Sequence, residues 1–263
     1  MAMMSGKKMK KILLNCMMLV AVTLFLIPAA AHSAISLDRT RVVFPGNEKS
    51  VSLNVNNQNR SLPYLAQGWI EDVNGNKLEA GGPLILLPPV QRIEPGAKSQ
   101  VKIQATPGLS LLPQDKETLF YLNLREIPPK SNKQNILQIA LQTRIKLFYR
   151  PEALALLAAE QQSAPFQEKL TLTRNGESYT VNNPTPYYIT LIGASSKVKG
   201  DPVKGFEAMM VPPKSSAKIG GKASELGREP VLVYVNDYGA MPSLTFRCDG
   251  TECRVDLKKR DNK

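Results

Sequence analysis

Alternating apolar and polar positions dominate the chain after residue 33 and predict β-strands. The longest such stretch is NILQIALQTRIKLFYRP, residues 135–151, in which Leu137, Ile139, Leu141 and every second residue up to Tyr149 share one face. A strand of this length would span about 45 Å, more than twice the usual strand length. Its length raises the question of which part of the apolar face belongs to the protein's own core.

The predicted strands fall into two groups, each separated internally by short turn signals. The first group is TRVVF, SVSLNVNN, YLAQGWIED, LILL, SQVKIQA, TLFYLNLREI and ILQIALQTRIKLFY; the second is KLTLTRN, SYTVNN, YYITLIGA, FEAMMV, SAKIG, VLVYVND, SLTFRC and CRVDL. Many short strands at close intervals are typical of an immunoglobulin-like sandwich. We therefore predict an all-β protein with two immunoglobulin-like β-sandwich domains, residues 34–152 and 165–263, joined by an alanine-rich linker, residues 153–164.

The N-terminus has the organisation of a secretory signal peptide, residues 1–33. MAMMSGKKMKK supplies four lysines and no acid, and a mostly apolar run, 12–27, follows it. Ala31 and Ser33 fit the −3 and −1 positions of a cleavage site, which would make Ala34 the first residue of the mature protein. A single membrane anchor is the alternative, but the apolar run is short for a membrane span. We therefore expect export to the periplasm and a product that is not embedded in a membrane.

Removing the signal changes which chemistry is available. Lysine and arginine fall from 34 to 30 against 22 acids, and the only histidine, His32, is lost with the signal. Histidine-based triads and histidine-containing zinc sites are then excluded. Cys248 and Cys253 in CDGTEC read as a short-loop disulfide in an exported protein, since two thiols alone cannot complete a tetrahedral metal site. We expect no catalytic residues, no cofactor and no metal.

Two interpretations compete for the apolar face of the long strand. Leu137, Ile139 and Leu141 either complete the protein's own core or are offered to a partner by strand addition. Periodicity alone favours the core. Trp69, the only tryptophan, is likewise predicted to lie in the core of the first sandwich.

Several long blocks resemble the periplasmic pilus chaperones of the PapD-like, chaperone–usher family, and most closely those that serve P pili. The blocks are SLDRTRVVF, LPYLAQGWIED, PPVQRIEPGAKS, LPQDKETLFYLNLREIPP, NILQIALQTRIKLFYRP, NPTPYYITLIG and VNDYGAMPSLTFRCDGTEC. The short connection IPPKSNKQN resembles the short-loop branch of the family. The resemblance implies that the two domains are set at an angle with a subunit-binding cleft between them.

The resemblance also implies how a pilin subunit would be bound. Leu137, Ile139 and Leu141 would enter the groove of a subunit whose sandwich lacks its last strand, by donor-strand complementation. Arg41 and Lys146 would anchor the C-terminal carboxylate of the subunit. Lys146 has the opposite parity to the three apolar residues, so this geometry needs a bulge, a strong twist or a cleft reached from the other face.

Further features are implied by the same resemblance. Glu117, Arg150 and Asp237 would form a charge network between the domains, with an ordinary surface ion pair as the alternative. Cys248 and Cys253 match the disulfide of the second domain in this branch. The expected partners are pilin subunits, the adhesin and an outer-membrane usher, and the free protein could self-associate.

Other classes of function fit the sequence less well. A secreted immunoglobulin-like adhesion or carbohydrate-binding module would also be β-rich, but it predicts exposed aromatic side chains that the sequence does not single out. A hydrolase with a Ser–Lys pair lacks its supporting motifs, and no phosphate-binding loop is present. The scattered positions of lysine and arginine argue against nucleic-acid binding. The prediction is a non-enzymatic chaperone.

Overall fold

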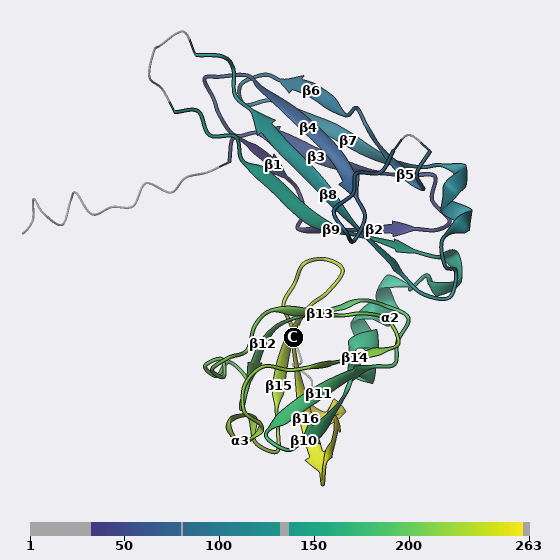
Figure 1. Cartoon of the computed structure of the whole chain (residues 1–263), viewed down its shortest axis with the longest axis vertical. Helices are drawn as coiled ribbons and strands as arrows, with labels where there is room; N and C mark the ends of the chain where they lie inside the picture. Colours follow the sequence, from purple (N-terminus) through teal and green to yellow (C-terminus); the bar gives the residue numbers. More distant parts are fainter. Residues whose placement is uncertain (1–32, 80, 132–136, 260–263) are drawn as a thin grey trace, which may run out of the picture. The chain divides into compact units, whose positions relative to one another are not determined.

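The computed structural model describes residues 33–79, 81–131 and 137–259. In it, the first domain is a sandwich of two β-sheets (Figure 1). One sheet has the strand order β1(Ile35–Leu37), β3(Ser50–Asn57), β7(Lys98–Ala105), β5(Leu84–Leu87). The other has the order β2(Arg41–Pro45), β9(Gln142–Arg150), β8(Thr118–Ile127), β4(Tyr64–Glu71), β6(Val90–Ile93). All neighbours are antiparallel except β2 and β9, which run parallel.

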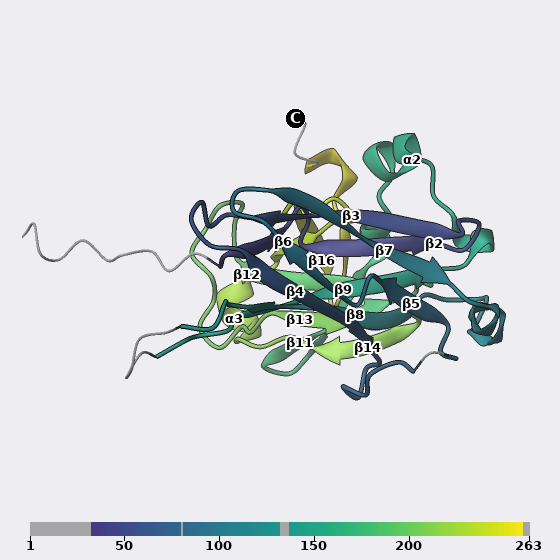
Figure 2. The same ribbon diagram turned by 90° about the horizontal axis from the view of Figure 1, so that it is seen from above.

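The core of this domain is made by the alternating inward positions of both sheets. Val42 and Phe44 of β2, Leu53 and Val55 of β3, and Leu147 of β9 are among its buried members. Figure 2 shows β4 and β8 side by side, as their antiparallel pairing requires. All seven predicted strands of the domain are present, and β1 and β6 are two short strands that the sequence pattern did not indicate.

The long strand predicted for residues 136–149, of which Ile136 lies outside the described residues, is shorter than expected. β9 begins at Gln142, and residues 137–141 form no strand, although the Glu126 N–H donates to the Leu141 carbonyl. Leu137, Ile139 and Leu141 are 84%, 64% and 38% exposed. The interpretation that they complete the protein's own core is therefore wrong. The core side of β9 is occupied instead by Ile145, Leu147 and Tyr149, which are buried in the first domain.

Trp69 is not a core residue, and that prediction is also wrong. The indole lies half-buried on the outer side of β4, because the inward positions of this strand are Ala66, Gly68 and Ile70. Its Nε1 donates to Glu71 Oε1 at 2.6 Å, and Lys77 Nζ lies 4.5 Å from the ring centroid. Polar and cationic neighbours therefore cover the tryptophan.

Glycine at position 68 is required by close packing between the sheets. A Cβ there would overlap with Leu86 Cδ2, a buried side chain of β5. The strand is paired with β8 on both sides of this position without a register shift, so no bulge is involved. A glycine inside a strand indicates either a bulge or a close approach of another group to the backbone. Here the close approach of Leu86 explains the glycine.

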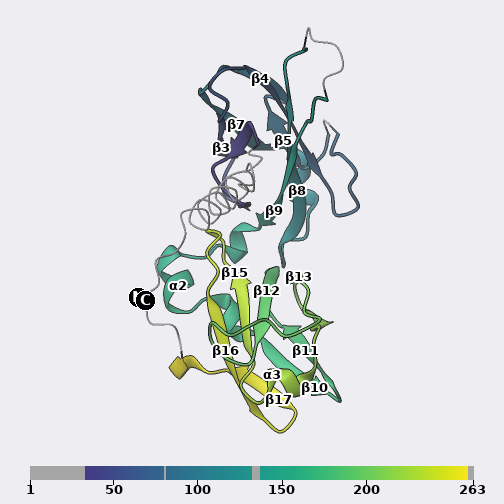
Figure 3. The same cartoon turned by 90° about the vertical axis from the view of Figure 1, so that its left-hand side faces the viewer.

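The second domain is a sandwich built from one continuous eight-stranded sheet, whose strands pack around a core of their own. Its order is β13(Met209–Val211), β12(Ile189–Ser195), β15(Val231–Val235), β16(Ser243–Asp249), β17(Glu252–Val255), β10(Thr171–Asn175), β11(Ser178–Asn183), β14(Ser215–Lys218). Figure 3 shows β12, β15 and β16 side by side. All eight predicted strands are present, and aliphatic and aromatic side chains such as Leu172, Leu191 and Phe246 fill the interior.

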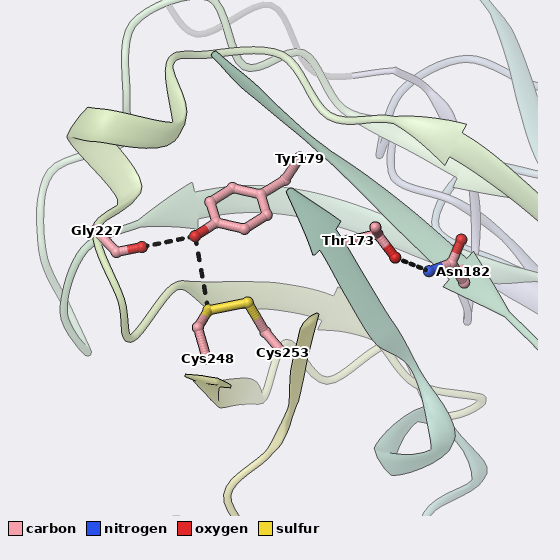
Figure 4. The surroundings of a disulfide bond; sticks show 6 residues. All are labelled: Thr173, Tyr179, Asn182, Gly227, Cys248 and Cys253. Atoms are coloured by element: carbon pink, nitrogen blue, oxygen red, sulfur yellow. Dashed lines mark hydrogen bonds between the residues drawn. A yellow bond between two sulfur atoms is a disulfide. The ribbon is translucent and has the colours of Figure 1, made fainter. Parts of the chain in front are cut away.

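The predicted disulfide joins Cys248 of β16 to Cys253 of β17 (Figure 4). The two residues are direct partners in the antiparallel ladder. The Tyr179 hydroxyl donates to the Gly227 carbonyl at 2.8 Å and lies 3.6 Å from Cys248 Sγ. The bridge is therefore packed against the core of the second domain, where Cys253 is almost fully buried.

Short helices lie mainly in the connections. They are η1(Pro107–Leu111), η2(Glu152–Leu154), α2(Ala158–Ser163), η3(Phe166–Lys169), α3(Ala223–Leu226) and η4(Leu257–Lys259). η2 and α2 occupy the alanine-rich segment that follows β9. Among the described residues, no helix has the length and apolar character of a membrane span.

Candidate functional site

Arg41 and Lys146, the two predicted anchor cations, are direct partners in the parallel pairing of β2 and β9. Arg41 is the first residue of β2, and the ladder between the two strands begins with this pair. The two strands therefore bring the cations together at the start of β2, although they are 105 positions apart in the sequence. Both side chains are half-buried.

Lys146 points away from the core of its own domain, as its parity predicted. The register between β8 and β9 shows no shift, so no bulge is needed to place it. Its Nζ donates to Thr190 Oγ1 of β12 at 3.0 Å. On the same face, Phe148 packs against Tyr188 with ring centroids 5.8 Å apart. This face of β9 therefore contacts the second domain. Of the three explanations for the parity of Lys146, the geometry supports a position reached from the other face of the strand, and not a bulge.

Arg41 also reaches the second domain. Its Nη1 donates to the carbonyl of Val235 in β15 at 3.0 Å, while its Nε is buried and has no hydrogen-bond partner among the residues that the structure describes. A buried N–H group without a partner is unfavourable by about 1 to 3 kcal/mol. An acceptor placed beside Arg41 Nε would remove that cost.

The electrostatics of the pair favour an anion. Burial lowers the pKa of Lys146, and the nearby Arg41 charge lowers it further. Burial also lowers the pKa of Arg41, against the opposing effect of the Asp237 and Glu117 carboxylates. Two desolvated like charges held side by side are unfavourable until a negative group joins them. A carboxylate can accept charge-assisted hydrogen bonds from both side chains at once.

The three predicted network residues lie together beside this pair. Arg150 Nε donates to Glu117 Oε1 at 2.8 Å, and Arg150 Nη1 donates to Asp237 Oδ2 at 2.7 Å. The Tyr188 N–H donates to Glu117 Oε2 at 2.7 Å. Arg150 and Glu117 are buried, so the surface ion-pair alternative does not describe them.

Burial dominates the acid–base behaviour of this network. It raises the pKa of Glu117 to about 7, while the Arg150 charge and the Tyr188 N–H act in the opposite direction. Burial alone would lower the pKa of Arg150, but the Glu117 and Asp237 carboxylates raise it above its ordinary value. The guanidinium therefore stays charged and joins one carboxylate of the first domain to one of the second.

The segment 137–141 leads into this site. It precedes the part of β9 that pairs with β8 alone, from Gln142 to Ile145, before β2 joins at Lys146. Within the described part of the chain, no strand pairs with the other side of β9 ahead of Lys146. Three exposed apolar side chains are therefore followed along the chain by an open sheet edge, and this edge ends where Arg41 and Lys146 lie opposite each other.

Sequence reasoning did not indicate every residue of the site. The sequence did not single out Thr190 and Val235, which accept hydrogen bonds from Lys146 and Arg41. It also did not single out the contact between the rings of Phe148 and Tyr188. No periodicity links these positions to Arg41, because their proximity arises only from contacts between the domains. No group of three or more His, Cys, Asp or Glu side chains in the described ranges could hold a metal ion.

Comparison with protein families gives two matches that together span most of the chain. Residues 34–155 match the model described as the pili and flagellar-assembly chaperone, PapD N-terminal domain. Residues 165–246 match the model described as the pili assembly chaperone PapD, C-terminal domain. The two matches correspond to the two sandwiches.

Individual relatives agree with these matches over nearly their whole lengths. The chain is 49% identical over 240 residues to the probable fimbrial chaperone YfcS of Escherichia coli strain K12, covering 90% of this chain and 93% of that protein. It is 49% identical over 242 residues to the chaperone protein PapD of Escherichia coli, covering 92% and 98%. Among solved structures, the CupB2 chaperone of Pseudomonas aeruginosa is 30% identical, with a TM-score of 0.65, covering 82% of this chain and 100% of that chain.

Proposed function

The chain belongs to the PapD-like family of pilus-assembly chaperones, whose members are periplasmic, and we propose that it holds pilin subunits by completing their β-sandwich. The observation that supports this most directly is the open edge of β9 from Gln142 to Ile145, which follows the exposed apolar side chains of residues 137–141 and ends at Arg41 and Lys146. Residues 1–33 are removed as a signal peptide on export.

The anchor fixes the direction of the added strand. If the subunit's C-terminal carboxylate binds Arg41 and Lys146, the chain that precedes it must extend along the free edge of β9 toward Leu137. That strand therefore runs in the same direction as β9 and occupies the sheet position that β2 occupies further along. Once residues 137–141 become extended, the edge from Leu137 to Ile145 offers about 30 Å for pairing.

The exposed side chains then have a defined role. When residues 137–141 become extended, Leu137, Ile139 and Leu141 lie on the same face as Ile145 and Leu147, which belong to the first-domain core. They enter the groove left by the missing strand of the subunit. Burial of each contributes about 1.5 to 3 kcal/mol, or about 5 to 9 kcal/mol for the three before ordering costs.

The carboxylate anchor sets the register of this pairing. A shift by one residue would turn every inserted side chain to the wrong face. Because the chain end can bind only where Arg41 and Lys146 converge, the anchor excludes such shifted pairings. The complex then delivers the subunit to an outer-membrane usher, where a neighbouring subunit's strand replaces residues 137–141. No catalytic residue, nucleotide or metal is needed for these steps.

Amide hydrogen exchange tests this proposal. The mature protein is compared alone and with one equivalent of a co-expressed pilin subunit. We expect strong new protection in residues 137–145, because their backbone groups pair with the subunit strand. Unchanged exchange there, in a complex that still forms, would contradict donor-strand binding. An adhesion or carbohydrate-binding module would instead show protection with a glycan and none with the pilin.

A further inference from the structure

The start of the first domain is held in a fixed position by the backbone. The Ala34 carbonyl accepts a hydrogen bond from the Gln58 N–H at 2.6 Å, and β1 follows with Ile35 paired to Asn57 of β3. Ala34 is 8% exposed, and Ile35 is a buried member of the core. The backbone nitrogen of Ala34 is therefore part of a packed region of the domain.

A buried carboxylate lies beside this region. Glu126 of β8 is 5% exposed, and its Oε2 accepts the Ile35 N–H at 2.9 Å. One residue of extended chain spans at most about 3.6 Å, so the Ala34 nitrogen lies within about 6.5 Å of this oxygen. An opposite charge at that separation stabilises a buried carboxylate.

We propose that signal-peptide removal creates an ion pair between the new α-ammonium group of Ala34 and the carboxylate of Glu126. This ion pair requires the processing that belongs to the proposed function. A signal peptidase hydrolyses the Ser33–Ala34 peptide bond with one water molecule, leaving a carboxylate on Ser33 and an ammonium group on Ala34. The nitrogen changes from a neutral amide to a cation while Gln58 and Ile35 hold the backbone beside it.

The ion pair makes processing a stabilising step for the first domain. In the precursor, Glu126 accepts the Ile35 N–H, and the nearby backbone nitrogen of Ala34 is a neutral amide. In the mature protein, the same carboxylate meets a charge held by the pairing of β1 with β3. Because β1 leads within a few residues to Arg41 and β2, the interaction also fixes the chain just ahead of the anchor.

A thermal-unfolding cycle tests the ion pair. Mature wild-type protein and Glu126→Gln are each prepared with a free and an acetylated α-amino group, the acetylation being done in denaturant near neutral pH, where the α-amino group deprotonates before lysine. Glutamine keeps an oxygen for the Ile35 N–H. We expect acetylation to lower the Tm of the wild type by about 3 to 8 °C and to leave the Tm of Glu126→Gln nearly unchanged. Glu48→Gln, an exposed control, should keep the full effect.

The outcomes separate this ion pair from the proposed function. An equal decrease of Tm in wild type and Glu126→Gln would show that acetylation acts through steric hindrance, and no decrease in either would show that the charge is not used; both contradict the ion pair. Intact mass identifies the first residue, and a start other than Ala34 also overturns it. Pilin binding by the unmodified protein is measured separately, so its loss would instead count against the proposed function.

Discussion

Arg41 lies directly opposite Lys146 where the parallel ladder of β2 and β9 begins. The position matters because β9 has a strand on both sides from Lys146 onward and on one side only before it. The two cations therefore stand at the boundary between the closed and open parts of one strand. A partner strand that pairs with the open part must reach them with its end.

Lys146 should make subunit binding depend on pH. Burial and the Arg41 charge hold the pKa of Lys146 below its ordinary value in the free protein, and a bound carboxylate would raise it. As pH rises toward the lowered pKa, Lys146 begins to lose its proton in the free protein but keeps it in the complex. The complex therefore binds more protons than the free partners. Affinity should fall with rising pH, beginning below pH 10.5, in calorimetric titrations with a pilin C-terminal peptide.

Lys146→Arg is the matched control for this dependence, because arginine stays charged throughout the range. Its affinity is expected to be lower at neutral pH, since the guanidinium has a different shape, but its pH profile should be flatter. A profile as steep as that of the wild type would show that another group titrates.

Ile139→Asp should abolish pilin binding without unfolding the chaperone. Ile139 is exposed in the free protein, so we expect a change in unfolding free energy within about 0.5 kcal/mol. In the complex the carboxylate would enter an apolar groove, and binding should weaken by at least about 2 kcal/mol. Denaturant unfolding and co-purification measure the two effects.

Ala140→Asp adds the same charge to the neighbouring position, which is also exposed and lies on the opposite face of the extended segment. It should weaken binding much less than Ile139→Asp. Equal losses from both variants would show that the segment is not inserted with the predicted alternation.

Arg150→Met should destabilise the protein by about 3 to 5 kcal/mol. The substitution leaves Glu117 buried without the cation that now donates to it, and Asp237 loses the same partner. Adding Glu117→Gln should restore part of the loss in urea unfolding. Asp115→Asn removes the exposed ion pair with Lys214 and should cost less than about 1 kcal/mol. Similar losses from Arg150→Met and Asp115→Asn would contradict the importance of burial.

Gly68→Ala should lower the free energy of unfolding by about 1 to 3 kcal/mol, because the added methyl group overlaps with Leu86 in a packed core. Gly81→Ala is the control, since a Cβ at position 81 meets nothing within 4 Å. A Gly68→Ala protein as stable as the Gly81→Ala protein would show that Leu86 can move aside without cost.

The sequence pattern predicted strands such as β3 and β4 well because buried and more exposed positions alternate along them. Ile145 and Leu147 alternate with residues of the outer face, and the core confirms this period. The same pattern was wrong for Leu137, Ile139 and Leu141, since periodicity shows which residues share a face and not what covers that face. Trp69 was misplaced for a related reason: its parity with Leu65 and Glu71 places it outward, and cations cover it.

The candidate site was only partly predictable. Arg41, Lys146, Glu117, Arg150 and Asp237 came from family motifs, and the structure brings them together. Thr190 and Val235 could not be predicted, because they meet the cations through contacts between residues of the two domains. Local patterning carries no information about such contacts.

The most direct test of the account is periplasmic co-purification of a co-expressed pilin subunit with wild type, Arg41→Ala and Lys146→Ala. We predict a one-to-one complex for wild type and its loss in either folded variant, since removing one partner of a desolvated charge pair costs about 2 to 5 kcal/mol. If both variants retain the pilin as well as wild type does, the carboxylate does not bind Arg41 and Lys146, and the anchor is refuted.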